Sequence, residues 1–82
     1  MSAQTHVAAF APIPRQRLSD ELVRRISESI GSGQYRAGDR LPPIAQMARG
    51  FRVGPATVRE ALTKLELMRI VEIRHGSGVY VK

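Results

Sequence analysis

The sequence predicts an α+β fold that is mainly α-helical, with three helices followed by a C-terminal two-stranded hairpin. Three observations predict it. Apolar residues recur at helical spacing in three segments, whereas residues 70–82, "IVEIRHGSGVYVK", alternate apolar and polar side chains around a glycine-containing turn. The length of 82 residues suffices for one small hydrophobic core, so we expect a single domain.

The first helix is expected in the segment "RLSDELVRRISESIGSG", residues 17–33. Ser19 has a side chain suited to capping the first turn, and the two acidic residues after it suit the positive end of the helix dipole. Arg24 and Arg25 are expected on the exposed face and are candidates for phosphate contacts. The apolar stripe consists of Leu22, Val23, Ile26 and Ile30.

A turn-rich connection, "GQYRAGDRLPP" at residues 33–43, precedes the second helix. Arg40 and Leu41 are expected to form a short strand, because a proline follows them directly. The second helix is expected to begin at Pro43, which suits a first turn. Its inward-facing residues are Ile44, Met47 and Ala48.

The third helix lies in "VGPATVREALTKLE", residues 53–66, with Gly54 as its N-cap and Pro55 as its first residue. Apolar residues at positions i, i+3, i+4 and i+7 fix its buried face. The first turn is unusual for a solvated surface, because it combines small and hydrogen-bonding groups with one long cation. The side chains expected outside are those of Ala56, Thr57, Glu60, Thr63 and Lys64, with Arg59 at the border.

The hairpin is expected to turn at Gly76-Ser77, since glycine followed by another residue suits a type II′ turn. The expected tip combines small residues with cations and consists of Arg74, His75, Gly76, Ser77 and Gly78.

This order of elements predicts a helix-turn-helix at residues 44–63 followed by a wing at residues 70–82. Residues 1–15 contain two prolines and show no periodicity, so we expect a flexible N-terminal arm before a domain at residues 16–82. In a helix-turn-helix, the first turn of the second helix enters the major groove of DNA, where small residues permit close approach. A wing tip with small residues and cations suits the minor groove.

The charge of the chain favours a polyanionic partner. The net charge is +6 at pH 7, and most of the excess lies in the second half of the chain. Cysteine is absent, which excludes disulfides and cysteine-based zinc sites. No apolar run is long enough to cross a membrane, so we expect no membrane partner.

Catalysis is not expected, because the sequence has no paired carboxylates beside a base and no glycine-rich phosphate loop. The two histidines, His6 and His75, are too few for a metal site, so neither a metal nor a cofactor is expected in this chain. One alternative stays open, a winged-helix module for contact with RNA or protein. The threonine and arginine of the third helix and the basic wing favour DNA.

From Gly33 to Val81 the chain resembles the DNA-binding domain of GntR-type bacterial transcription regulators. The resemblance rests on "GQYRAGDRLP", "VGPATVREALTKLE" and "IVEIRHGSGVYV", which stand in the family's order and spacing. It implies a winged helix that binds double-stranded operator DNA as a homodimer in a cytoplasmic, nucleoid-associated regulator such as a repressor. A small-molecule effector is implied only for a C-terminal domain beyond these residues. The wing and the "REAL" stretch are most similar to the FadR-like branch.

The resemblance places Thr57, Arg59, His75 and Gly76 at positions that the family uses on DNA. Ala56, Thr63 and Ser77 join this set as small groups on the exposed helix face or at the wing tip.

The chain also departs from the family pattern. Ala45 and Pro55 stand where family members have contact cations. Arg49 and Arg52 replace an acidic residue and a glycine, and we expect them to restore phosphate contacts. Arg69 replaces a helix-ending glycine, although arginine adopts the left-handed conformation only at a cost in free energy.

Structural alternatives exist for three of these side chains. Arg59 could form a surface ion pair with Glu66, and Thr57 could bond the backbone of its own helical turn. Glu60 suits an ion pair with Lys64 better than a contact with cytosine. We expect the isolated domain to be monomeric, because no apolar stripe remains once the core positions are assigned.

Overall fold

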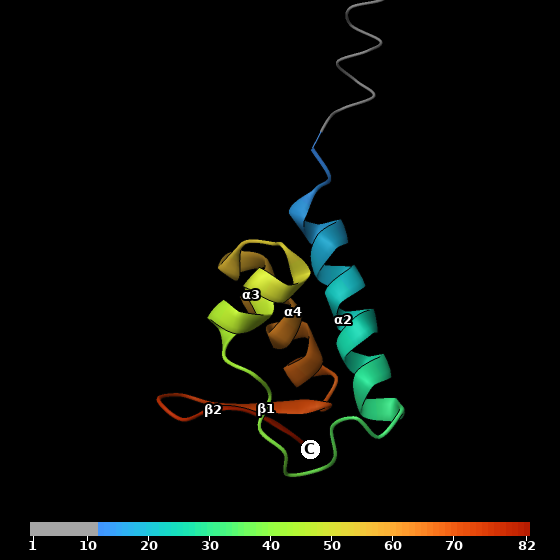
Figure 1. The fold of residues 1–82 in the computed structure, drawn as a ribbon, viewed down its shortest axis with the longest axis vertical. Coiled ribbons are helices and arrows are strands. Elements are labelled where there is room, and N and C mark those ends of the chain that lie inside the picture. The colour runs from blue at the N-terminus through green and yellow to red at the C-terminus, as the bar shows by residue number, and fades with distance from the viewer. Residues whose placement is uncertain (1–11) are drawn as a thin grey trace, which may run out of the picture.

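The computed structural model describes residues 12–82, which form three helices and a two-stranded antiparallel sheet. The predicted α+β fold, mainly α-helical, is therefore confirmed (Figure 1). In chain order the elements are α2 (Arg15–Gly31), α3 (Ile44–Phe51), α4 (Pro55–Leu67), β1 (Val71–Arg74) and β2 (Gly78–Val81).

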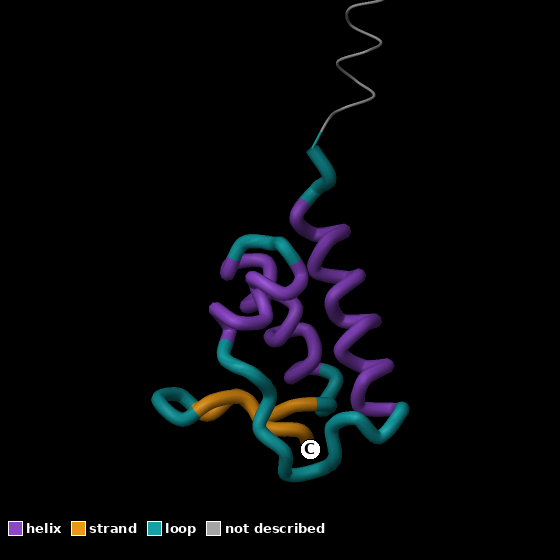
Figure 2. The backbone as a smooth tube through the Cα atoms, viewed as in Figure 1, coloured by secondary structure: helices purple, strands orange, loops and turns teal. Residues whose placement is uncertain are grey.

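The three helices lie together on one side of the hairpin, which crosses their lower ends and projects beyond α3 (Figure 2). α4 is the central helix, because it packs against α2, α3 and β1. Its Val58, Ala61 and Leu65 have no exposed surface. The rest of the buried apolar core comes from α4 itself, from every other element and from the linker before α3, and consists of Leu22, Ile26, Leu41, Met47, Ala48, Leu62, Val71, Val79 and Val81.

The register of the hairpin separates a core face from an outer face. Val71 pairs with Val81, and Arg74 pairs with Gly78. Because successive side chains of a strand point to opposite faces, the buried valines lie on the core face and Glu72, Arg74 and Tyr80 lie on the outer face. The predicted short strand before α3 is present as one isolated antiparallel bridge between Arg40 and Tyr80.

The expected start of the first helix at Ser19 is wrong. α2 begins at Arg15, and Pro14 occupies the N-cap position without a side-chain hydrogen bond. Ser19 lies fully buried inside the helix, where its hydroxyl is 2.9 Å from the Gln16 carbonyl and 3.0 Å from the Glu60 carboxylate. Its capping preference is overridden by this contact with α4.

The expected N-terminal arm at residues 1–15 lies mostly outside the described residues. Residues 12–14 have no regular secondary structure, and Arg15 already belongs to α2.

The expected type II′ turn at Gly76-Ser77 is also wrong. The Ser77 amide donates to the Arg74 carbonyl at 2.9 Å, so the two central residues of the turn are His75 and Gly76. Gly76 has a φ of 77°, the positive value that the second central residue of a type II turn requires. The three residues His75, Gly76 and Ser77 together form the wing tip.

Between residues 12 and 82, no helix combines the length and the apolar character needed to cross a bilayer.

Candidate nucleic-acid interface

The start of α4 matches its prediction. Gly54 is the N-cap in an extended conformation, and Pro55 is the first helical residue, where its missing amide hydrogen has no helical partner to lose. Ala56, Arg59 and Thr63 are exposed. These three residues therefore present a small group, a long cation and a threonine to solvent along one side of the helix. The Thr63 hydroxyl donates to the Arg59 carbonyl at 3.0 Å.

Thr57 differs from its prediction, since only 4% of its surface is exposed. The expected pattern assumed one buried stripe, whereas α4 packs against three other elements and buries a wider face. Ala56 and Arg59 are thus the exposed groups of the first turn. A contact between Thr57 and DNA stays a prediction that this burial does not favour.

Arg59 does not form the surface ion pair considered from the sequence. The Glu66 carboxylate instead accepts a hydrogen bond from the Ile73 backbone amide at 2.9 Å, which connects the end of α4 to the wing. Within the described part of the chain, no carboxylate lies within ion-pair distance of Arg59. Its guanidinium is therefore available to an external acceptor.

Helix and wing enclose a common hollow, which we name the helix–wing hollow, of about 310 Å³. Arg59 and Thr63 of α4 and His75 of the wing tip line it together. Its remaining lining is apolar and consists of Ile44, Leu62, Ile73 and Val79. The structure thus brings together predicted contact residues that lie 12 or more positions apart in the sequence.

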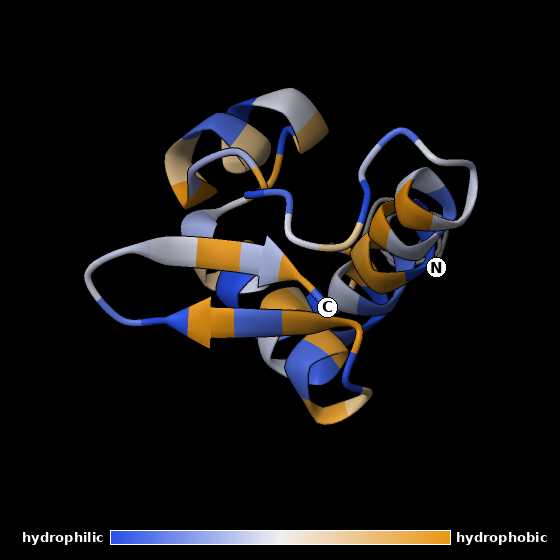
Figure 3. Cartoon of the chain, turned by 90° about the horizontal axis from the view of Figure 1, so that it is seen from below, coloured by the Kyte–Doolittle hydropathy of each residue, from blue (hydrophilic) through white to orange (hydrophobic). Residues whose placement is uncertain are grey.

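The wing tip is exposed at His75, Gly76 and Ser77, as predicted. Tyr80 supports it, a role that the sequence did not reveal: its hydroxyl lies 2.7 Å from the Ser77 hydroxyl. The Arg74 guanidinium carbon also lies 4.3 Å from the centre of the Tyr80 ring, a cation–π geometry. Figure 3 shows the hairpin from below, with the tip extending away from the helices.

Arg49 and Arg52 are both exposed at the end of α3, directly before the turn that leads into α4. Arg52 has a φ of 58° and caps α3 in the left-handed conformation that glycine adopts most readily. Arg69, beyond α4, has a φ of 62°, as its position predicted. At each site the chain carries a cation at a backbone position where glycine would be less strained.

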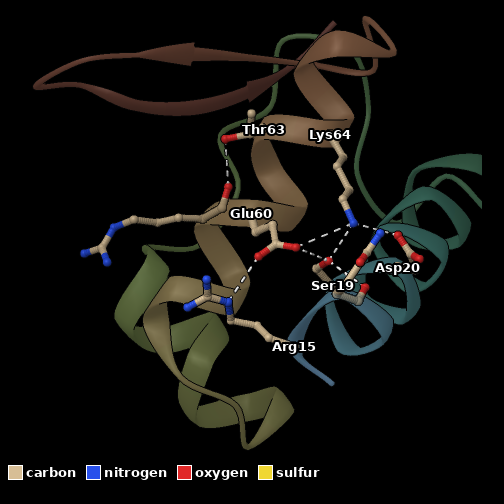
Figure 4. A network of polar contacts seen from close by, with 8 residues as sticks. Arg15, Ser19, Asp20, Glu60, Thr63 and Lys64 are labelled. Atoms are coloured by element: carbon tan, nitrogen blue, oxygen red, sulfur yellow. Dashed lines mark hydrogen bonds and ion pairs between the residues drawn. The ribbon is translucent and has the colours of Figure 1, made fainter. Parts of the chain in front are cut away.

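The Glu60 carboxylate, beside Arg59, is paired with cations in a polar network between α2 and α4 (Figure 4). Its carboxylate lies 3.2 Å from Arg15 Nε and 3.7 Å from Lys64 Nζ, so the predicted pair with Lys64 is confirmed. Lys64 also contacts Ser19 and Asp20 of α2, each at 2.7 Å. This network offsets the repulsion that a free Glu60 would exert on a polyanion beside α4.

Arg24 and Arg25 pair with carboxylates of their own helix, so a phosphate contact from either stays a prediction. Both bond the Glu21 carboxylate, and Arg24 also contacts Glu28 at 2.7 Å. Hydrogen bonds from Arg24 and then Arg25 lower the pKa of the Glu21 carboxyl below its ordinary value. The charges on this face of α2 are therefore balanced locally.

Comparisons with known proteins agree with this geometry. Residues 18–81 match the family model described as "Bacterial regulatory proteins, gntR family". The chain is 42% identical over 74 residues to the HTH-type transcriptional regulator RmpR of Mycobacterium gastri, covering 88% of the chain and 27% of that protein. The chain spans between 26% and 31% of the length of the curated relatives RmpR, Rv0494 of Mycobacterium tuberculosis and the Uxu operon transcriptional regulator of Escherichia coli.

Solved structures share the fold. A GntR family transcriptional regulator from Listeria monocytogenes superposes with a TM-score of 0.76 at 31% identity, covering 79% of this chain and 57% of that one. The DNA-binding domain of AraR, solved in complex with operator ORX1, superposes with a TM-score of 0.77 at 21% identity, covering 87% of this chain and 82% of that one. The latter likeness concerns the fold alone.

Proposed function

Because the chain belongs to the gntR family of bacterial regulatory proteins, we propose that residues 16–82 are the sequence-specific DNA-binding module of a transcription regulator. α4 enters the major groove, and the wing tip lies at the adjacent minor groove. The observation that carries this proposal is the helix–wing hollow, where Arg59 of α4 and His75 of the wing face the same space.

Each exposed residue of the interface has a distinct task. Ala56 permits close approach of the helix to the bases, and Arg59 donates to the acceptors of guanine. His75, Gly76 and Ser77 enter the minor groove, where the small tip fits between the two strands. Thr63 lies one helical turn beyond Arg59 and lines the same hollow.

Arg49 and Arg52 contact phosphates and set the position of α4. Both are exposed cations at the turn before α4. Contacts of this kind carry no sequence information, but they supply much of the affinity and its salt dependence.

The intact regulator binds its operator as a homodimer, and the isolated domain is monomeric. Most of the length of its curated relatives lies outside the part that this chain covers, which leaves room for a domain that dimerises and binds a small-molecule effector. The same family supports action as a repressor in the cytoplasm, on nucleoid DNA, and the wing favours the FadR-like branch. The family is one of regulatory proteins and not of enzymes.

A selection experiment tests this function. The chain is used to enrich a randomised duplex pool, and its affinity is then measured for the enriched duplex, a scrambled duplex and the enriched sequence as an RNA duplex. We expect enrichment of a defined sequence and the tightest binding to that DNA. Equal affinity for the three duplexes would contradict sequence-specific DNA binding, and preference for the RNA would support the alternative module for RNA contact.

A further inference from the structure

Arg40 belongs to the linker between α2 and α3, but the backbone places it in the wing. The Leu41 amide donates to the Val79 carbonyl at 2.8 Å, and the Val81 amide donates to the Asp39 carbonyl at 2.8 Å. These two bonds pair Arg40 with Tyr80 along the free edge of β2. Because directly paired residues project to the same face, Arg40 lies on the outer face of the hairpin with Tyr80.

Gly78 makes room for the Arg40 side chain. A β-carbon at position 78 would lie 2.6 Å from Arg40 Nε, 3.2 Å from Cζ and 3.3 Å from Nη2. The guanidinium therefore rests directly on the backbone of β2, in space that only glycine leaves open. This contact holds the Arg40 side chain beside the wing tip. The Arg40 backbone itself pairs with Tyr80, which lies two residues further along β2 than Gly78.

Arg74 approaches the same place from the other strand. It pairs with Gly78 in the hairpin register, so it shares the outer face with Arg40. Its guanidinium lies over the Tyr80 ring, and one of its nitrogens lies 3.3 Å from Glu72. Tyr80 and Glu72 thus hold Arg74 in one orientation, as Gly78 holds Arg40.

The two arginines and His75 line a hollow of about 360 Å³ together with the wing residues Gly76, Ser77 and Gly78. The apolar side chains of Ile44, Ile73 and Val79 complete its lining, and they also line the helix–wing hollow. We name it the wing hollow. In the described residues, no carboxylate lies within ion-pair distance of Arg40. The wing hollow therefore combines two guanidinium groups, one imidazole and the backbone of the turn with an apolar part, and the acid paired with one of its arginines is Glu72.

We propose that the wing hollow is a phosphate-binding site in which Arg40 and Arg74 clamp one backbone phosphate of the DNA strand beside the minor groove. The guanidinium group has the planar donor arrangement that suits phosphate oxygens. Phosphate contacts at this hollow, along the side of the wing, would fix the depth and direction of the wing tip. This inference rests on the proposed DNA-binding function and adds Arg40 and Arg74 to the interface.

The first test compares Arg40→Ala with Arg36→Ala. Arg36 is an exposed arginine of the same linker that does not line the wing hollow, so it serves as a matched control for charge. Affinities are measured for the enriched and the scrambled duplex at several salt concentrations. Arg40→Ala is expected to weaken both complexes roughly tenfold at low salt and to make the salt slope shallower by about one unit. Arg36→Ala is expected to change neither.

The second test uses Gly78→Ala in two backgrounds. In the wild-type background it displaces Arg40 and weakens DNA binding; in the Arg40→Ala background it should cause little further loss. Backbone strain from the φ of 147° at position 78 would act in both backgrounds, so an equal loss in both overturns the positioning role of Gly78. Thermal unfolding of all variants shows whether each remains folded.

Inorganic phosphate is the probe that shows whether the wing hollow binds a phosphate of the DNA backbone or free phosphate. A titration followed through the amide NMR signals of residues 76–78 is expected to approach saturation only at concentrations well above roughly 1 mM, because one isolated phosphate lacks the contacts of a duplex. Saturation far below that concentration would identify a site for free phosphate and overturn the assignment to DNA.

The outcomes also separate this inference from the proposed function. If the wild-type chain binds no duplex, both fail. If it binds duplex DNA and Arg59→Ala weakens binding, while Arg40→Ala behaves like Arg36→Ala, the wing hollow alone is refuted.

Discussion

Arg59 and Thr57 lie two positions apart on α4, but they differ in how accessible their side chains are to a ligand. Arg59 is exposed and borders the helix–wing hollow, whereas Thr57 is 4% exposed. Helical spacing alone predicted Thr57 to lie outside and Arg59 to lie at the border of the exposed face. The difference arises because α3 and α2 both pack on α4, and the width of a buried face depends on neighbours that no local pattern identifies.

Replacement of Arg59 should affect the enriched sequence most. Its planar group suits the O6 and N7 acceptors of guanine in the major groove. Arg59→Ala is expected to cost about 1–3 kcal/mol of binding free energy on the enriched duplex and much less on scrambled DNA. Fluorescence anisotropy with both duplexes measures this. Equal losses on both would mean that Arg59 binds only the DNA backbone.

Arg52 carries a conformational cost that glycine would remove. With its φ of 58°, Arg52→Gly is expected to raise the free energy of unfolding by about 1 kcal/mol. The same change should weaken binding to every duplex and make the salt slope shallower by about one unit, because a phosphate contact is lost.

Arg69→Gly is the matched control for that prediction. Arg69 has a similar φ of 62° but lies beyond the far end of α4. We expect a similar gain in stability from urea denaturation and an unchanged salt slope. A slope that changes equally in both variants would show that the loss of charge acts through the net charge of the domain, not through a contact at Arg52.

At the scale of elements, the sequence predicts the start of a helix correctly where neighbouring residues determine the backbone conformation, and wrongly where a distant contact determines it. Gly54 and Pro55 start α4 as predicted, because proline fixes its own φ and favours an extended conformation for the residue before it. Ser19 does not start α2, because its hydroxyl contacts Glu60, 41 positions away. The turn at His75-Gly76 depends on the register Arg74 to Gly78, which packing of the valines determines.

The network between α2 and α4 gives a stability prediction. Ser19→Ala removes a fully buried hydroxyl that contacts both Glu60 and Lys64, so it should lower the free energy of unfolding by about 1–3 kcal/mol. Asp20→Ala removes one exposed partner of Lys64 and should cost less than about 1 kcal/mol. Urea denaturation distinguishes the two. Equal effects would show that the network stabilises mainly through its surface charges.

At the scale of the molecule, the sequence could predict which elements occur, but only their packing shows which side chains meet. Arg59 and His75 were both expected to contact DNA, and the fold places them at one hollow. Arg40 gave no signal, because its place in the wing follows from a backbone bridge to Tyr80 and from the space at Gly78. Contacts across such distances in sequence have no local pattern.

The surface of the domain predicts a monomer. In the described part of the chain, the strongly exposed large apolar residues are Ile13, Leu67 and Met68, of which Leu67 is 79% and Met68 56% exposed. Two adjacent side chains cover far less than the roughly 800 Å² per partner of a standard interface. Sedimentation equilibrium at micromolar concentration should give the mass of one chain. A stable dimer without DNA would contradict this expectation.

Methylation interference on the enriched duplex tests most directly whether helix and wing recognise two adjacent grooves together. Methyl groups at guanine N7 block the major groove, and those at adenine N3 block the minor groove. We predict interference at both kinds of atom in neighbouring positions, with Arg59→Ala removing the N7 interference and His75→Ala removing the N3 interference. Interference confined to one groove, or unaltered by both variants, would contradict a shared helix–wing interface.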